Sequence, residues 1–190
     1  RDAQESRGLG DVYKRQGRIY AGLFAAGSVA GRTGKGIAMR IEVVRYTKEK
    51  IPDVVAFEHA LRKEEAFWNW EIDENYRKKV EQSFEQSVFA NSISLLAYDG
   101  GRVVGRIDSS MIASHFDGSV KAYLDWICVI KSCRHRGVAQ QLMQSLRAEL
   151  KKEGVDTLVG LIAANEEAQR FYHALPRAQV RDEGIWIDIG

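Results

Sequence analysis

Residues 127–140 read ICVIKSCRHRGVAQ, and this stretch decides the fold class of the chain. An apolar run is followed by a short basic segment and then by a helical pattern, which predicts a buried strand, a loop and a helix. The free N–H groups of a helix N-terminus attract anions. Gly137 would allow close approach to the backbone, and Arg134 and Arg136 would add positive charge. The stretch therefore predicts a diphosphate site; a pair of solvated loop cations is the alternative interpretation.

The segments on either side of this stretch alternate between strand and helix patterns. Strands are expected at residues 39–46, 93–98, 102–111, 122–130, 157–163 and 184–189. Helices are expected from Pro52 to about Glu65, from Asp73 onward, and at residues 137–153 and 165–175. The order β-α-α-β-β-β-α-β-α-β indicates an α/β domain on a mixed sheet, with a hairpin at residues 99–101.

Two of the expected helices carry clear apolar stripes. In the helix that Asp73 would cap, an apolar residue recurs at every fourth position: Tyr76, Val80, Phe84 and Val88. The helix at residues 137–153 has a similar stripe that consists of Val138, Leu142, Leu146 and Leu150, and Gly154 is placed to end it. Both helices are therefore expected to pack on a core.

The first 38 residues differ from the rest in composition. They contain eight glycines, seven Lys/Arg and three Asp/Glu, a charge of +4 within a chain whose net charge is +2, which leaves −2 for residues 39–190. A segment without apolar period cannot offset its ordering entropy, so residues 1–38 are expected to be a disordered or non-native extension. Met39 is expected to open the domain, residues 39–190. Its mildly acidic balance gives no support to nucleic-acid binding and suits a cationic ligand.

Several other classes of protein are not supported by the sequence. Cys128 and Cys133 form neither a disulfide framework nor a CxxC pair, and the histidines lack metal-ligand spacing, so no metal site is expected. No apolar run approaches the roughly 20 residues of a membrane helix, so no membrane partner is expected. A reducing cytoplasm is the expected compartment.

Two motifs in this order resemble the signatures of the GCN5-related N-acetyltransferase (GNAT) family. Arg134-x-x-Gly137-x-Ala139 resembles the acetyl-CoA signature Q/R-x-x-G-x-G/A, and Val129 stands where the family's strand has a valine. The second signature, N-x-x-A-x-x-F-Y, is similar to the segment that runs from Asn165 to Tyr172. His135, Lys131 and Ala139 depart from the commonest family residues, but none of them removes a backbone donor. The stretch after Tyr172 also departs from the family pattern, which bears on the last strands and on the acceptor. The resemblance is sharp over residues 125–175.

The resemblance implies a GNAT fold, acetyl-CoA as co-substrate and a set of site residues. The residues that would bind acetyl-CoA are Ile127, Cys128, Val129, Arg134, His135, Arg136, Gly137, Val138, Ala139, Gln140, Asn165, Ala168 and Phe171. Amides near Cys128 and Val129 would polarise the thioester carbonyl. Tyr172 would protonate the departing CoA sulfur, or else pack its helix on the core. Asn165 would bond the pantetheine arm, or else cap the helix.

The acceptor side is less defined by the sequence. Strand alternation would put Asp125 on one face with Ile127 and Val129, so Asp125 is a candidate general base, with a structural role as the alternative. Acidic residues gather in the segments expected to contact the acceptor, and they would favour a cationic amine. The alternative is that they form an ordinary charged helix face. These residues are Glu64, Glu65, Glu71, Asp73, Glu74, Asp182, Glu183 and Asp188. The aromatic residues Phe67, Trp68 and Trp70 would shape an acceptor pocket or fill the core.

These features together predict an N-acetyltransferase that transfers acetyl from acetyl-CoA to a primary amine of a small molecule by direct attack in a ternary complex. The C-terminal residues are loosely similar to those of aminoglycoside N-acetyltransferases, so an aminoglycoside or polyamine-like acceptor is one expectation. A non-catalytic acyl-CoA-binding module with the same fold is the alternative. The expected partners are acetyl-CoA and the amine, and a homodimer is left open.

Overall fold

The computed structural model describes residues 40–65, 70–181 and 187. They divide into two compact units, residues 40–160 and the residues from 161 onward, and each unit is described by itself. The expectation of a non-native extension at residues 1–38 lies outside the described residues, as does the strand expected at residues 184–189, of which only Ile187 is described. No helix in the described part of the chain is long and apolar enough to cross a membrane.

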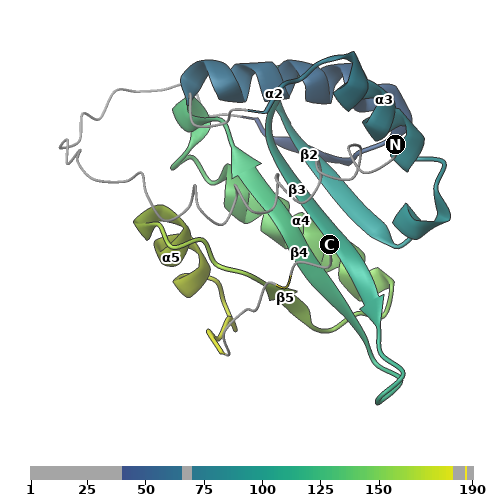
Figure 1. Ribbon diagram of the computed structural model, residues 1–190. Helices are drawn as coiled ribbons and strands as arrows, with labels where there is room; N and C mark the ends of the chain where they lie inside the picture. Colours follow the sequence, from purple (N-terminus) through teal and green to yellow (C-terminus); the bar gives the residue numbers. More distant parts are fainter. Residues whose placement is uncertain (1–39, 66–69, 182–186, 188–190) are drawn as a thin grey trace. The chain divides into compact units, whose positions relative to one another are not determined.

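The first unit is built on a five-stranded sheet in the order β1-β2-β3-β4-β5 (Figure 1). The strands are β1 (Glu42–Arg45), β2 (Ser92–Asp99), β3 (Arg102–Ala113), β4 (Val120–Val129) and β5 (Leu158–Gly160). Strands β1 to β4 pair antiparallel, and β5 pairs parallel to β4. The α/β class and the mixed sheet predicted from the sequence are therefore confirmed.

Helices cover both faces of this sheet. They are α2 (Ile51–Glu64), α3 (Glu74–Ser83) and α4 (Val138–Lys152), with short 3₁₀ turns η1 (Lys48–Lys50), η2 (Ser87–Phe89) and η3 (Lys131–Cys133). Adjacent residues of β3 show the two layers, because side chains alternate along a strand. Gly105 faces Val138 and Leu142 of α4, whereas Arg106 reaches Glu58 of α2. Figure 1 shows α4 behind the central strands and α2 crossing above them.

The core on the α4 side follows the predicted stripe. Val138, Leu142, Leu146 and Leu150 are all buried, and Gly154 follows the helix with φ +75°. That conformation is rarely adopted by residues with a Cβ atom, so Gly154 ends α4 in the predicted way. The stripe packs mainly on β2 and β3, which fixes the start of the helix against the centre of the sheet.

Helix α3 is shorter than its pattern predicted. Asp73 caps it as expected, since its Oδ1 accepts a hydrogen bond from the Tyr76 amide at 2.8 Å. The helix ends at Ser83, however, whose hydroxyl bonds back to the Val80 carbonyl at 2.7 Å and so competes with the helical ladder. The prediction that the apolar stripe continues to Val88 on a core is wrong: α3 buries no side chain fully, and Val88 is 76% exposed.

Strand β5 is also shorter than expected. It covers Leu158–Gly160 rather than residues 157–163, and its pairing with β4 runs only from Ala122 to Leu124. The next residue of β4 interrupts the regular pairing with β3, so the strand direction changes where β5 ends.

In the second unit, α5 (Glu166–His173) is the one helix of the described residues. Asn165 caps it, because its Oδ1 accepts a hydrogen bond from the Ala168 amide at 2.8 Å. The Gln169 side chain bonds the Ala163 carbonyl at 3.1 Å and ties the helix to the preceding segment. The helix predicted at residues 165–175 is therefore present, with its last turn ending two residues early.

Candidate active site

The loop between β4 and α4 has the backbone shape that the sequence predicted. Strand β4 ends at Val129, the turn η3 follows, and α4 begins at Val138 with Gly137 as its N-cap. Gly137 has φ +81°, and a Cβ atom there would meet nothing within 4 Å. The glycine is therefore required by its left-handed backbone rather than by lack of space. His135 is also left-handed, at φ 59°.

The first amides of α4 point out of the helix toward this loop. The first intrahelical bond runs from the Gln141 amide to the Gly137 carbonyl at 3.0 Å. Gly137 has no side chain that could cap the helix amides before Gln141. Such amides carry the positive end of the helix dipole and bind anions. Ala139 is partly exposed, and His135, Arg136 and Gln140 are exposed.

Gly105 on β3 sets how close this helix start lies to the sheet. A Cβ atom at Gly105 would be 3.0 Å from Val138 Cγ1 and 3.1 Å from Leu142 Cδ1. Gly105 also pairs with Val129, the last residue of β4. The same glycine therefore contacts both the end of β4 and the start of α4. The sequence analysis missed Gly105, although a glycine inside an expected strand is a signal of close approach.

Arg134 is arranged differently from Arg136. Its guanidinium donates to Glu65 Oε1 at 3.0 Å and to Glu65 Oε2 at 2.5 Å, and its Nε donates to the Val129 carbonyl at 3.0 Å. The expectation that both arginines offer their charge to a diphosphate stays a prediction; Arg134 also shares its charge with the buried carboxylate of Glu65. Sequence reasoning assigned Glu65 to the acceptor, and no local signal could have predicted this partner.

The edge of β4 opens beside Ile127 and Cys128. Within the described residues, β5 pairs with β4 only as far as Leu124, whereas β3 stays paired to Val129. Among the strands that the structure describes, the stretch from Asp125 to Val129 therefore has a neighbour on one side only. Cys128 is buried, and this burial raises the pKa of its thiol to about 12. A thiol that is neutral at pH 7 agrees with the interpretation of Cys128 as a small apolar residue.

Asp125 is the extra residue of a bulge in β4. Asp108 pairs with Trp126 and Ser109 pairs with Leu124, so Asp125 has no opposite residue. The bulge interrupts the alternation of side chains along β4. Alternation therefore no longer implies that Asp125 shares a face with Ile127 and Val129, as was expected. Asp125 is exposed overall, but partial desolvation of its carboxyl raises the pKa first and the Asp108 charge raises it further, while Arg106 lowers it.

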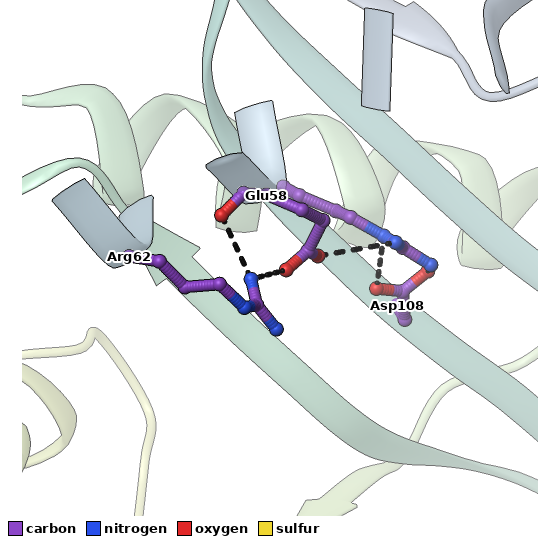
Figure 2. Close-up of polar contacts among 4 residues, drawn as sticks. Glu58, Arg62 and Asp108 are labelled. Carbon is purple, nitrogen blue, oxygen red and sulfur yellow. Dashed lines mark hydrogen bonds and ion pairs between the residues drawn. The ribbon is translucent and has the colours of Figure 1, made fainter. Parts of the chain in front are cut away.

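Asp125 is therefore coupled to charges on the α2 side of the sheet, where four side chains form a polar cluster. Figure 2 shows Glu58 of α2 in contact with Arg62, and the guanidinium of Arg106 lies between Glu58 and Asp108. Arg62 contacts Glu58 Oε2 at 2.7 Å, and Arg106 lies 3.8 Å from Glu58 Oε1 and 2.7 Å from Asp108 Oδ2. Burial alone would lower the pKa of Arg106, but the Asp108 charge raises it overall. The two arginines and the two carboxylates pair their charges on this side of the sheet, although the buried Arg62 Nη2 has no hydrogen-bond partner among the described residues.

Two tryptophans lie next to this cluster. The rings of Trp70 and Trp126 meet edge to face at 6.1 Å, and the Arg62 guanidinium lies 4.4 Å from the centre of the Trp70 ring. Trp126 directly follows Asp125, so the bulge places a carboxyl group next to an aromatic side chain in the sequence. Phe67 and Trp68, which the sequence analysis grouped with Trp70, lie outside the described residues.

The second motif is described within its own unit. Asn165 uses its side-chain oxygen as a cap, which supports the capping interpretation. The rings of Phe171 and Tyr172 meet at 5.2 Å, and both side chains are partly exposed. The roles predicted for Ala168, Phe171 and Tyr172 toward acetyl-CoA stay predictions. Among the residues that the structure describes, no group of three His, Cys, Asp or Glu could hold a metal ion.

Solved structures share this fold at low sequence identity. An aminoglycoside acetyltransferase from an uncultured soil metagenomic sample, solved in complex with sisomicin, has a TM-score of 0.67 and 13% identity over 79% of this chain and 97% of that one. The aminoglycoside acetyltransferase AAC(6')-Iy, in complex with a CoA bisubstrate analog, has a TM-score of 0.63 and 19% identity over 78% and 97%. A ribosomal-protein-alanine N-acetyltransferase from Brucella melitensis has a TM-score of 0.61 and 14% identity over 78% and 97%.

A comparison with curated proteins by sequence finds no match. The family model described as the acetyltransferase (GNAT) family matches residues 55–175. This range includes the β4–α4 loop, both motifs and the helices that cover the sheet. The chain therefore belongs to the GNAT family of acetyltransferases.

Proposed function

We propose that the chain is an acetyl-CoA-dependent N-acetyltransferase that transfers acetyl to a primary amine of a small molecule. The observation that carries this proposal is the start of α4. Gly137 is left-handed and leaves the first amides of the helix without a side-chain cap, at the end of the strand β4. A diphosphate fits this arrangement because it needs several convergent N–H donors and positive charge, and Arg136 is exposed beside them.

The open edge of β4 supports a role in positioning the thioester. Residues Ile127 to Val129 lie in a strand whose β5 partner has already ended. Main-chain N–H groups on such an edge are fixed by the sheet and need no reorganisation when charge develops on a carbonyl oxygen. We assign the thioester carbonyl to this edge, and the remaining cofactor contacts to His135, Val138, Ala139, Gln140, Asn165, Ala168 and Phe171.

Asp125 is the proposed general base. An acceptor amine must lose a proton before or during its attack, and a carboxylate with a raised pKa accepts that proton, directly or through water, better than an ordinary one. Burial and the neighbouring Asp108 both raise the pKa of Asp125. Tyr172 is the proposed acid that donates a proton to the departing thiolate. In a ternary complex the amine attacks the thioester directly, so no acyl-enzyme is required, which agrees with the neutral, buried thiol of Cys128.

The acceptor is proposed to be cationic, with an aminoglycoside or polyamine as the first class to test. Asp125 and Asp108 supply negative charge, and Trp126 and Trp70 supply aromatic faces that attract a cation. The aminoglycoside acetyltransferases among the similar structures motivate the same choice.

Two measurements test the proposal. Calorimetry with CoA and acetyl-CoA should detect binding by the purified chain, and a thiol-release assay over aminoglycosides, polyamines, amino acids and peptide N-termini should find at least one acceptor. Absence of any binding heat would contradict the cofactor site. Binding without thiol release across the whole panel would instead favour the non-catalytic acyl-CoA-binding module.

A further inference from the structure

The end of α2 holds the β4–α4 loop through two adjacent carboxylates. Glu64, the last residue of α2, accepts hydrogen bonds from the Ser132 amide at 2.8 Å and from the Ser132 hydroxyl at 2.7 Å. Glu65, the next residue, accepts both Arg134 contacts at 3.0 and 2.5 Å. The two pairs join positions 68 and 69 residues apart in the sequence. One helix end therefore contacts two points of the loop.

The Glu65–Arg134 pair is the stronger of the two contacts. The side chain of Glu65 is only 4% exposed and that of Arg134 17%. Two parallel N–H···O bonds from a planar guanidinium to a carboxylate fix both distance and orientation, and a buried carboxylate without its partner is strongly disfavoured. Glu64 is exposed, and its pKa is lowered first by the Ser132 amide and then by the Ser132 hydroxyl. Glu64 thus adds a weaker, ionised contact beside a rigid one.

The third bond of Arg134 connects this pair to the sheet. Its Nε donates to the carbonyl of Val129, the final residue of β4. The guanidinium consequently spans the end of α2 and the end of β4. The backbone then passes through His135 at φ 59° and Gly137 at φ +81° before α4 begins. A left-handed conformation at a residue such as His135 costs energy and persists only when the surrounding structure holds it.

We propose that Glu65 is a positioning residue for the cofactor loop, which acts by holding Arg134 so that the loop presents the α4 amides to the diphosphate of CoA. Arg134 then contributes through the shape of the loop, and the exposed Arg136 supplies the charge that meets the phosphates. The inference rests on the proposed function, because it assigns a task to residues around that same site.

Calorimetry with CoA on single variants tests this assignment. Glu65→Gln and Arg134→Gln should each weaken CoA binding about tenfold, and the double variant should bind no more weakly than either one, because both changes break the same contact. Glu81→Gln, which replaces an exposed glutamate on α3, is the matched control and should leave binding unchanged. Additive losses in the double variant would contradict the proposal.

The dependence of CoA affinity on salt separates positioning from direct contact. Loss of a cation that touches phosphate weakens the salt dependence, whereas loss of a positioning contact does not. Arg136→Gln should therefore reduce the slope of log Kd against log salt, while Arg134→Gln and Glu65→Gln should keep the wild-type slope. A reduced slope in Arg134→Gln, together with tighter binding in Glu65→Gln, would show that Arg134 binds the diphosphate itself.

Thermal unfolding without ligand completes the test. All Kd values are measured well below the Tm of each variant. A merely structural role of Glu65 would lower Tm and leave Kd unchanged, and this result would also contradict the proposal. If Glu65→Gln does not fold, the double variant replaces it in the test, because it leaves no lone buried charge. Its CoA affinity should then be about tenfold weaker than that of the wild type, with an unchanged slope of log Kd against log salt. If wild type gives no CoA signal, the proposed function itself fails; if wild type binds CoA and Glu65→Gln binds equally, only the positioning role fails.

Discussion

Gly105 of β3 and Val138 of α4 are so close that a Cβ atom on the glycine would be 3.0 Å from Val138 Cγ1. This distance is shorter than ordinary van der Waals contact, so the start of α4 rests directly on the backbone of the sheet. Core packing at Gly105 therefore contributes to the orientation of the amides at the helix start.

Gly105→Ala should destabilise the protein by about 1–3 kcal/mol, the usual cost of an added methyl group in a packed core. It should also weaken CoA binding, because Val138 is the first residue of α4. Urea denaturation and calorimetry measure the two effects. Gly105→Val should be worse in both, and wild-type stability in Gly105→Ala would show that the contact relaxes freely.

Gly137 makes the opposite prediction, since the space around its Cβ position is open and its φ is +81°. Gly137→Asn should retain most CoA affinity because asparagine tolerates the left-handed region, whereas Gly137→Val should lose it. Calorimetry at one temperature compares the two variants. Equal loss in both would indicate that the glycine is needed for close approach of the ligand and not for its conformation.

Asp125→Asn should raise Tm at pH 7. The pKa of Asp125 is raised in the folded state by burial and by Asp108, so the unfolded chain holds the ionised carboxylate more favourably. Ionisation thus destabilises the fold as pH rises through the interval between the unfolded pKa, about 3.9, and the higher folded value. The gain in Tm should vanish below that interval. A scan of Tm from pH 3 to pH 8 checks this, and a lower Tm at pH 7 would contradict it.

Arg106→Met should cost about 3–5 kcal/mol, because it leaves Asp108 without its cation, and Glu58 with Arg62 alone, in a mostly buried cluster. Arg102→Met, at the exposed start of the same strand, is the control and should change stability by less than about 0.5 kcal/mol. Urea denaturation of both variants measures the difference. Similar values would mean that the cluster is solvated and contributes little.

Tyr172→Phe should lower turnover on the order of 10²-fold while the Kd for acetyl-CoA changes little, if the hydroxyl donates a proton to the leaving thiolate. Thiol release with an accepted amine and calorimetry separate the two quantities. Tyr98→Phe, which removes a hydroxyl bonded to Asp53 at 2.6 Å, is the control. Unchanged turnover in Tyr172→Phe would leave this tyrosine a packing role only.

Features that depend on a few neighbouring residues were predictable from the sequence. Asp73 and Asn165 cap their helices because the bond is formed within three residues, and Leu142 and Leu146 are buried because a period fixes a helix face. The position of Gly137 between a strand and a helix was predicted in the same way. Local chemistry determined each of these outcomes.

Features that depend on pairing between distant segments were not predictable. The bulge at Asp125 exists only relative to Asp108 and Ser109 of β3, and simple alternation along β4 does not account for it. The Glu65–Arg134 pair joins positions 69 residues apart, and either residue alone is consistent with solvent exposure. Helix α3 ends early where the Ser83 hydroxyl donates to the Val80 carbonyl, a bond that apolar periodicity does not reveal.

The alternation of Gly105 and Arg106 along β3 has an evolutionary consequence. One residue faces the helix that would serve the invariant co-substrate, and the next faces the polar and aromatic side chains proposed for the acceptor. Under the proposed function, substitutions around Arg106 can alter which amine is recognised without disturbing the packing of α4 on Gly105. A strand with two such faces permits the choice of acceptor to diverge while the co-substrate stays the same.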